Sequence, residues 1–374
     1  MNVIFTCGGT GGHINPAIAV ANAWRERHPD DKILFIGGYG NMEEQLVPKA
    51  GYDIKVFHAF GLEREISWHA LRMNYWAIKS TISAIYKCKK LFREFKPDII
   101  LGTGGYASFP ALVAGAKMGI PTCVHEANAM PGLTTRLVAD RVSKVLVCFP
   151  ESAKHYRHPE KVEVVGMPVR REFIYTKKEE ARKALGLDSR PVIVSTFGSQ
   201  GARTMNEVTA ELFRLEQEAG FPYQHIHAVG NYGWQWLPDY VRSLGVDTSK
   251  TDSIMMKEYI YNMPEVMAAA DVVISRAGAS SCNEIAASGT PCILIPSPNV
   301  TDNHQEKNAR ALAATGGAEL VLEKDCTAKL LMEKIQGILA DPQRYSDMGK
   351  ALQNMVIPDC AERLCDTMEA LIKK

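Results

Sequence analysis

Short apolar runs alternate with helix-like stretches along the whole chain, and this alternation restricts the fold more than any other feature. In the first half the apolar runs lie at residues 3–6, 33–36, 54–57, 99–102, 122–125, 144–147 and 162–165. After a charged stretch at residues 170–188 they resume at 191–197, 225–229, 253–259, 272–275 and 291–296. Strands joined by helices build a parallel sheet with helices on both faces. The sequence therefore predicts an α/β protein with two nucleotide-binding-type halves, whose ligands bind at the carboxyl ends of the strands.

Each half begins with a strand that runs into a glycine-rich loop. The first loop, CGGTGGH at residues 7–13, leads into a helical pattern at 17–24, and the second is GSQG at 198–201. Backbone N–H groups at such a loop favour a phosphate or a sugar. His13 is the titratable group of the first loop that changes charge near neutral pH. Ile14 stands where a dinucleotide fingerprint needs its third glycine, so we do not expect a nicotinamide cofactor.

Composition argues against several functional classes. The chain has 374 residues and is 46% hydrophobic, which is enough for two or three domains with their own cores. Its 43 basic and 42 acidic residues leave a net charge of +1, so no nucleic-acid partner is expected. Nine cysteines without a C-x-x-C pair indicate reduced thiols and no metal site. The chain begins inside a predicted strand, and glycines and a proline interrupt the uncharged stretch 99–116, so neither a signal peptide nor a membrane span is expected.

The strand at 272–275 runs into RAGASSCNE at residues 276–284, before a helix predicted at 285–288. The N–H groups of this segment offer a second anion site. Ser281 and Glu284 also have the spacing of a capping box, in which the glutamate only satisfies the first helical turn. A glutamate can instead accept hydrogen bonds from two ribose hydroxyls, and the segment alone leaves both roles open.

Polar residues also follow other predicted strands. The stretch 302–308 is polar throughout and is either a solvated helix start or a sugar site, since the amides of Gln305 and Asn308 share one helical face. Loops at 102–106 and 125–128 lie where such sheets bind ligands, although a lone Glu or Asn there is more often a turn residue. His225 and His227 have no third ligand nearby and are interpreted as packed residues.

A helical stretch near residues 68–96 combines an apolar stripe with many cations. The stripe consists of Trp68, Leu71, Tyr75, Ile78, Ile82, Ile85 and Phe92, and its default explanation is core packing. The cations are Arg72, Lys79, Lys87, Lys89, Lys90, Arg93 and Lys96, against the single acid Glu94. Trp76 projects among Arg72, Lys79 and Lys87, as expected at a lipid headgroup interface. We therefore predict that this stretch docks on an anionic membrane surface.

Seven segments together resemble the MurG family of bacterial peptidoglycan glycosyltransferases, from the first strand to the last helix. They lie at 8–13, 102–106, 125–128, 166–170, 198–202, 276–284 and 302–309. The resemblance implies a GT-B fold, with two Rossmann-like domains of parallel sheet facing across a cleft. It places an acceptor and membrane-facing domain at 1–168, a donor domain at 169–358, and a last helix at 359–374 that packs back on the first domain.

The resemblance also implies the reaction: transfer of N-acetylglucosamine from UDP-N-acetylglucosamine to the 4-hydroxyl of lipid I, giving lipid II with inversion. A peripheral location on the cytoplasmic face of the cell membrane follows. Inversion needs one base and stabilisation of the leaving diphosphate, with no covalent nucleophile. The loop motifs contain no Asp-x-Asp pair, which fits helix dipoles and Arg170 in place of a metal or other cofactor.

Individual roles follow from the same resemblance. Thr10, Gly11 and Gly12 would face the donor sugar and diphosphate, and Gly104, Gly105 and Tyr106 the acceptor. His13 would be the general base, and Asn128 would contact the transferred sugar or the approaching acceptor. Arg170 and Ser199 would hold the diphosphate, and Ile260 would present backbone groups to uracil. The phosphate would meet Ala279, Ser280, Ser281, Cys282 and Asn283, the ribose Glu284, and the donor sugar Gln305 and Asn308.

The sequence departs from the family pattern at His304, where many relatives carry a second glutamine, and at Ala127 and Met167. Two other classes of function remain as alternatives, one enzymatic and one nonenzymatic. A UDP-sugar epimerase or glycolipid synthase would share the fold, and an epimerase would act on UDP-N-acetylglucosamine without an acceptor. A nonenzymatic membrane-associated nucleotide sensor would fit the basic helix but would leave His13, Gln305 and Asn308 without a role.

Overall fold

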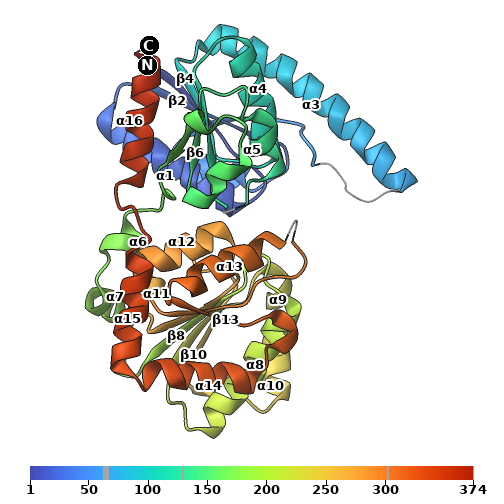
Figure 1. Ribbon diagram of the computed structural model, residues 1–374. Helices are drawn as coiled ribbons and strands as arrows, with labels where there is room; N and C mark the ends of the chain where they lie inside the picture. The colour runs from blue at the N-terminus through green and yellow to red at the C-terminus, as the bar shows by residue number, and fades with distance from the viewer. Residues whose placement is uncertain (62–66, 129, 301–302, 374) are drawn as a thin grey trace. The chain divides into compact units, whose positions relative to one another are not determined.

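The computed structural model describes residues 1–61, 67–128, 130–300 and 303–373. The chain divides into two compact units, one of residues Met1–Arg170 with Ile357–Lys374 and one of Arg171–Val356 (Figure 1). We call them unit 1 and unit 2. The chain passes from unit 1 to unit 2 after residue 170 and returns after residue 356, each two residues from the boundary expected from the sequence. Arg170 therefore belongs to unit 1.

Unit 1 is built on a seven-stranded sheet in the order β3-β2-β1-β4-β5-β6-β7, and every neighbouring pair is parallel. The strands are β1 Asn2–Thr6, β2 Lys32–Gly38, β3 Asp53–Phe57, β4 Ile99–Gly102, β5 Thr122–Glu126, β6 Lys144–Val147 and β7 Val162–Val164. The helices are α1 Gly11–Arg27, α2 Glu43–Lys49, α3 Trp68–Phe95, α4 Phe109–Lys117, α5 Leu133–Val138 and α16 Cys360–Ile372. All seven strands fall on apolar runs predicted from the sequence.

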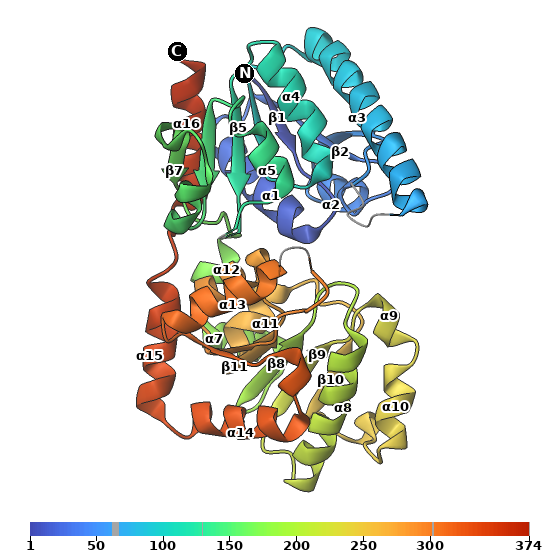
Figure 2. The same cartoon turned by 45° about the vertical axis from the view of Figure 1, so that its right-hand side comes forward.

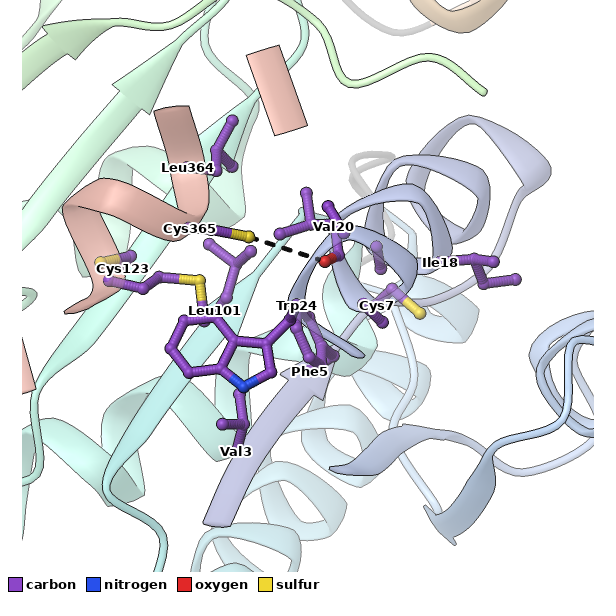
Figure 3. Close-up of a cluster of buried hydrophobic side chains, with 14 of the residues drawn as sticks. Val3, Phe5, Cys7, Ile18, Val20, Trp24, Leu101, Cys123, Leu364 and Cys365 are labelled. Atoms are coloured by element: carbon purple, nitrogen blue, oxygen red, sulfur yellow. Dashed lines mark hydrogen bonds between the residues drawn. The ribbon is translucent and has the colours of Figure 1, made fainter. Parts of the chain in front are cut away.

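The core of unit 1 lies on both faces of this sheet. Alternation along β1 sends Val3 and Phe5 to the face covered by α1 and α16, and Ile4 to the face covered by α3 and α4 (Figure 2). Trp24 of α1 is completely buried in the first cluster, together with residues of the C-terminal helix α16 (Figure 3). The thiol of Cys365 in α16 lies 3.9 Å from the carbonyl oxygen of Val20 in α1. The last helix is thus part of the N-terminal core.

Unit 2 repeats the design with a six-stranded parallel sheet in the order β10-β9-β8-β11-β12-β13. Its strands are β8 Val192–Thr196, β9 Gln224–Ala228, β10 Ile254–Lys257, β11 Val272–Ser275, β12 Cys292–Leu294 and β13 Ala318–Leu320. Its helices are α6 Glu172–Tyr175, α7 Lys178–Leu185, α8 Arg203–Glu218, α9 Asn231–Trp234, α10 Leu237–Ser243, α11 Met263–Ala269, α12 Ala279–Ser288, α13 His304–Ala314, α14 Ala328–Leu339 and α15 Pro342–Gln353. β13 was not expected from the sequence, because it has three residues and the charged Glu319 at its centre.

Helix α3 corrects the core-packing explanation of its apolar stripe. Five stripe residues are at least half exposed: Trp68 at 89%, Leu71 at 57%, Tyr75 at 63%, Ile78 at 55% and Ile82 at 50%. The buried face instead presents Ala70, Ala77, Ala84, Cys88 and Phe92. The alanines stand seven residues apart, and nearer the end of the helix Cys88 and Phe92 share a buried cluster with residues of α4. Of the stripe, Phe92 is buried in the core and Ile85 is partly buried against it.

No helix in the described part of the chain is both long enough and apolar enough to cross a membrane.

Candidate functional site

The site in unit 1 lies where the strand order reverses, at the carboxyl ends of β1 and β4. The glycine loop after β1 and the loop after β4 touch there. A Cβ atom added to Gly105 would lie 2.2 Å from the carbonyl oxygen of Gly8, and one added to Gly104 would lie 3.1 Å from Nδ1 of His13. The hydroxyl of Thr103 donates to the carbonyl oxygen of His13 at 2.6 Å. The structure therefore brings the predicted base and the predicted acceptor loop together within one unit.

His13 lies in the first turn of α1, which begins at Gly11 after the extended residue Thr10. The carbonyl oxygen of Thr10 accepts from the N–H groups of His13 and Ile14, at 3.0 and 3.2 Å. The N–H groups of Gly11 and Gly12 stand at the open end of the helix, where first-turn donors have no partner inside the helix. These two glycines remain candidates for a ligand contact.

Glu43, at the start of α2, was not singled out from the sequence, yet it holds this site together. Its buried carboxylate accepts from the N–H of Gly9 at 3.1 Å through Oε2, and from the N–H of Gly38 at 2.8 Å through Oε1. The amide nitrogen of Asn41 donates to the same carboxylate at 3.3 Å, and the hydroxyl of Tyr106 donates to Asn41 Oδ1 at 3.1 Å. The expectation that the backbone N–H groups of this loop are open to a phosphate or a sugar is therefore wrong for Gly9, whose N–H already donates to the Glu43 carboxylate.

Cys7, the residue directly after β1, has an unreactive thiol. Its thiol is completely buried, and burial together with the nearby Glu43 carboxylate raises its pKa far above the usual range. A thiol that stays protonated is a poor nucleophile. The residue contributes packing to the floor of the site.

Gly105 provides a test of how tightly these loops meet. We expect Gly105→Ala to reduce turnover at least tenfold, because its Cβ would overlap the Gly8 carbonyl and displace the loop beside His13. Both Gly105 and Gly119 have positive φ, 80° and 73°, but nothing lies within 4 Å of a Cβ at Gly119. Gly119→Ala therefore carries the same backbone strain without the overlap and should retain near wild-type turnover. Equal rates for the two variants would show that the loop contact is unimportant.

The loop after β5 is organised by Glu126. One carboxylate oxygen accepts from the backbone N–H and the side-chain amide of Asn128, at 3.0 and 2.9 Å, and the other accepts from the N–H of Gly132 at 2.9 Å. Glu126 thus acts as the turn residue that the sequence allowed. Burial lowers the pKa of His125, whose Nε2 donates to the carbonyl oxygen of Gly166 at 2.8 Å. The neutral Nε2–H form of His125 ties this loop to the segment before Arg170.

The site in unit 2 lies at the equivalent reversal, between β8 and β11. Helix α12 begins at Ala279 after Gly278, which makes no side-chain cap. Ser281 and Glu284 therefore both lie inside the helix, so the capping-box alternative and the predicted start at residue 285 are wrong. The Glu284 carboxylate accepts from the hydroxyl of Ser280 at 3.2 Å.

Buried contacts fix the turn before α12. The side-chain amide nitrogen of Asn308, which is 1% exposed, donates to the carbonyl oxygen of Ala277 at 3.2 Å. Arg276 donates to the carbonyl oxygen of Ile295 at 3.1 Å and forms an ion pair with Glu323. Asn308 thus supports the backbone at the start of α12, a role that its polar neighbours in sequence did not suggest.

The other predicted donor residues also belong to unit 2, with Gln305 in the first turn of α13 and Ser199 and Ile260 in loops. The Gln305 side-chain oxygen accepts from the N–H of Ser297 at 2.9 Å, and Asp302 of the same polar stretch lies outside the described residues. The Ser199 carbonyl oxygen accepts from the N–H of Asn231 at 3.3 Å. The Ile260 side chain is buried, so any ligand contact there would come from its backbone. Among the described residues, no cluster of three His, Cys, Asp or Glu side chains could hold a metal.

Two domains of one known protein family match the chain. The N-terminal domain of glycosyltransferase family 28 matches residues 3–147, and the C-terminal domain of that family matches residues 192–364. The chain belongs to glycosyltransferase family 28. A family 28 relative from Bacillus cytotoxicus is 38% identical over all of both chains, and is named UDP-N-acetylglucosamine--N-acetylmuramyl-(pentapeptide) pyrophosphoryl-undecaprenol N-acetylglucosamine transferase.

Solved structures resemble this family 28 chain in fold. MurG of Acinetobacter baumannii has a TM-score of 0.74 at 22% identity and covers 99% of each chain. The UDP-GlcNAc 2-epimerase of Neisseria meningitidis bound to UDP-GlcNAc has a TM-score of 0.67 at 17% identity, covering 99% of this chain and 100% of its own. The predicted GT-B fold of two parallel-sheet, Rossmann-like domains is confirmed. Because an epimerase shares it, the fold alone does not select the reaction.

Proposed function

We propose that this family 28 chain transfers N-acetylglucosamine from UDP-N-acetylglucosamine to the 4-hydroxyl of the muramyl residue of lipid I, forming lipid II. The observation that carries the proposal is the 38% identity over the full length of a relative named for this transfer. The contact between His13 and the loop after β4 also supports it, because a histidine beside the proposed acceptor loop is in a position to act as the base. The epimerase of Neisseria meningitidis, by comparison, shares the fold at only 17% identity.

The chemistry divides between the two units. On unit 1, His13 takes the proton from the acceptor hydroxyl as it attacks the anomeric carbon, with Gly104, Gly105 and Tyr106 shaping the acceptor site. On unit 2, the N-terminus of α12 and Ser199 stabilise the charge that develops on the departing UDP. Arg170, the last residue of the first segment of unit 1, assists them. The attack breaks the bond from the anomeric carbon to the diphosphate in the same step, so the configuration inverts and no covalent nucleophile is needed.

Turnover with a lipid I analogue tests this proposal directly. We expect release of UDP and transfer of the sugar only when both substrates are present. Incubation with UDP-N-acetylglucosamine alone is the control for an epimerase, which would change the sugar without any acceptor. Binding of the nucleotide sugar with no turnover in either mixture would favour the sensor alternative and overturn the transferase proposal.

We further propose that α3 docks this enzyme peripherally on the cytoplasmic face of the membrane that carries its acceptor. The exposed apolar stripe of α3 runs beside cations, and the Nζ of Lys79 lies 5.1 Å from the centre of the Trp76 ring. Trp76 and Lys79 also line a cavity of about 240 Å³, together with Phe57, His58, Phe60 and Lys87, among others. Apolar side chains flanked by cations fit a surface with anionic headgroups over acyl chains.

Two substitutions on the exposed stripe of α3 test this docking. We expect Ile78→Glu with Ile82→Glu to reduce binding to vesicles of anionic lipid at least tenfold, because both side chains are half exposed on the stripe and would no longer enter the acyl region. Sedimentation with anionic and with neutral vesicles, at low and high salt, gives the measurement. Leu137→Glu, at an aliphatic position of unit 1 that is 45% exposed, is the matched control. The proposal would be contradicted if binding did not depend on lipid charge or salt and was the same for the wild type and the Ile78→Glu, Ile82→Glu variant.

A further inference from the structure

Five buried polar side chains in unit 2 form one continuous line of hydrogen bonds between α8 and the strands β8 and β9. In order along the line they are Glu216, His225, Ser195, His227 and Asn206. The hydroxyl oxygen of Ser195 lies 2.7 Å from Nε2 of His225 and 2.7 Å from Nδ1 of His227. Each of the five is at most 1% exposed, so its polar atoms depend on their neighbours in the line rather than on bulk water.

At the Asn206 end of the line, the partners determine which group donates and which accepts each hydrogen bond. The carbonyl oxygen of Val229 can only accept, so the side-chain amide nitrogen of Asn206, 2.9 Å away, donates to it. The amide oxygen of Asn206 then faces Nε2 of His227 at 3.2 Å, and this nitrogen must carry a hydrogen. Burial next to His225 lowers the pKa of His227 to about 3, so His227 is neutral and its Nδ1 is a bare acceptor.

The same direction continues to Glu216. Because Nδ1 of His227 accepts, the single hydroxyl hydrogen of Ser195 points to it. The Ser195 oxygen must then accept from a hydrogen on Nε2 of His225. One further proton lies between Nδ1 of His225 and the Glu216 carboxylate, whose atoms are 2.8 Å apart. The imidazole of His227 is thereby held in one tautomer from both sides.

The line ends at the turn against which the second glycine loop packs. A Cβ at Gly201 would lie 2.3 Å from the carbonyl oxygen of Val229, the same oxygen that binds Asn206. Two residues on, the N–H of Asn231 donates to the carbonyl oxygen of Ser199 at 3.3 Å. The loop therefore rests on a turn whose position is set by the amide of Asn206, and α8, which carries Asn206, is the helix that the loop opens (Figure 1).

We propose that His227 is a positioning residue that, by orienting the Asn206 amide, sets the glycine loop at residues 198–201 for the diphosphate of the nucleotide sugar. This inference rests on the proposed function, since it assigns the donor diphosphate to that loop. His227 touches no substrate. Its part is to keep the amide oxygen of Asn206 occupied, so that the amide nitrogen remains on Val229.

Two substitutions at His227 separate positioning from simple packing. His227→Gln places an amide nitrogen near the former Nε2 and keeps the donor to Asn206, whereas His227→Asn places its amide near the former Nδ1 and loses that donor. Titration calorimetry with UDP should give His227→Gln an affinity within threefold of wild type and His227→Asn one weaker by about tenfold, the size of one lost hydrogen bond. Both variants remove an imidazole from the core, so their melting temperatures should fall by similar amounts.

Nitrogen-15 NMR of labelled histidines shows which ring nitrogens of His225 and His227 carry a hydrogen, and it needs no measurement of enzyme activity. In the wild type we expect His227 to carry its hydrogen on Nε2 only and His225 to carry one on Nε2 as well. A hydrogen on Nδ1 of His227, or equal UDP affinities for the two variants while the wild type binds UDP, would overturn this inference alone. Failure of the wild type to bind UDP would overturn the proposed function and this inference together.

Discussion

Replacing His13 by alanine is expected to lower turnover by a factor of about 10²–10⁴ while leaving the affinity for UDP within twofold of wild type. A general base acts only on the acceptor hydroxyl, and His13 lies in unit 1 against the loop after β4, whereas the predicted diphosphate and ribose contacts at Ser199 and Glu284 lie in unit 2. Steady-state turnover with a lipid I analogue and calorimetry with UDP give the two measurements.

His13→Gln is the matched control for this prediction. Glutamine fills similar space and still forms hydrogen bonds, but it cannot accept a proton near neutral pH. If His13 is the base, both variants should be equally slow; if it only supports the loops, glutamine should restore much of the rate. A turnover within tenfold of wild type for His13→Ala would place the base elsewhere.

The fold was largely accessible from the sequence because its strands are buried on both faces. Such strands read as continuous apolar runs, and glycine loops mark where each half begins. β13 escaped because Glu319 at its centre is a charged residue, paired there with Lys334 and Arg344. A strand of three residues stabilised by ion pairs carries no periodicity that a local pattern can detect.

The site was accessible only in part. Glycine loops and polar strand ends located the loops correctly, since topology alone brings the ends of neighbouring parallel strands together. The residues that hold those loops are hidden from local patterns: Glu43 reaches back to Gly9 across 34 positions, and Asn308 reaches Ala277 across 31. Such contacts depend on tertiary structure, and the sequence marks them only as an acid near a helix start and an amide in a polar run.

The face of α3 that meets the protein was also misjudged for a physical reason. Periodicity shows that a helix is amphipathic but not which face packs inward. Here the small side chain of Ala77 is buried, and the larger Ile78 is left at the surface. A large apolar stripe that a fold leaves exposed usually marks an interaction surface. The exposure of this stripe therefore supports the proposed membrane docking.

Glu284→Ala is expected to weaken UDP binding by about 10- to 100-fold, the range for lost hydrogen bonds to a charged acceptor. Its carboxylate belongs to the second turn of α12 and is not needed to cap that helix, because the helix starts five residues earlier at Ala279. The observed partner of Glu284 Oε1 is the Ser280 hydroxyl at 3.2 Å, and carboxylates have further acceptor positions for the two ribose hydroxyls.

Nucleotide analogues show whether the loss arises at the ribose. Wild-type protein should bind UDP more tightly than 2′,3′-dideoxy-UDP, which lacks both hydroxyls, whereas Glu284→Ala should bind the two with equal affinity. Discrimination that survives in the variant would mean that Glu284 acts through the structure of α12 instead. Because the comparison is made between two ligands on one variant, a general loosening of the helix weakens both equally and cannot imitate the expected result.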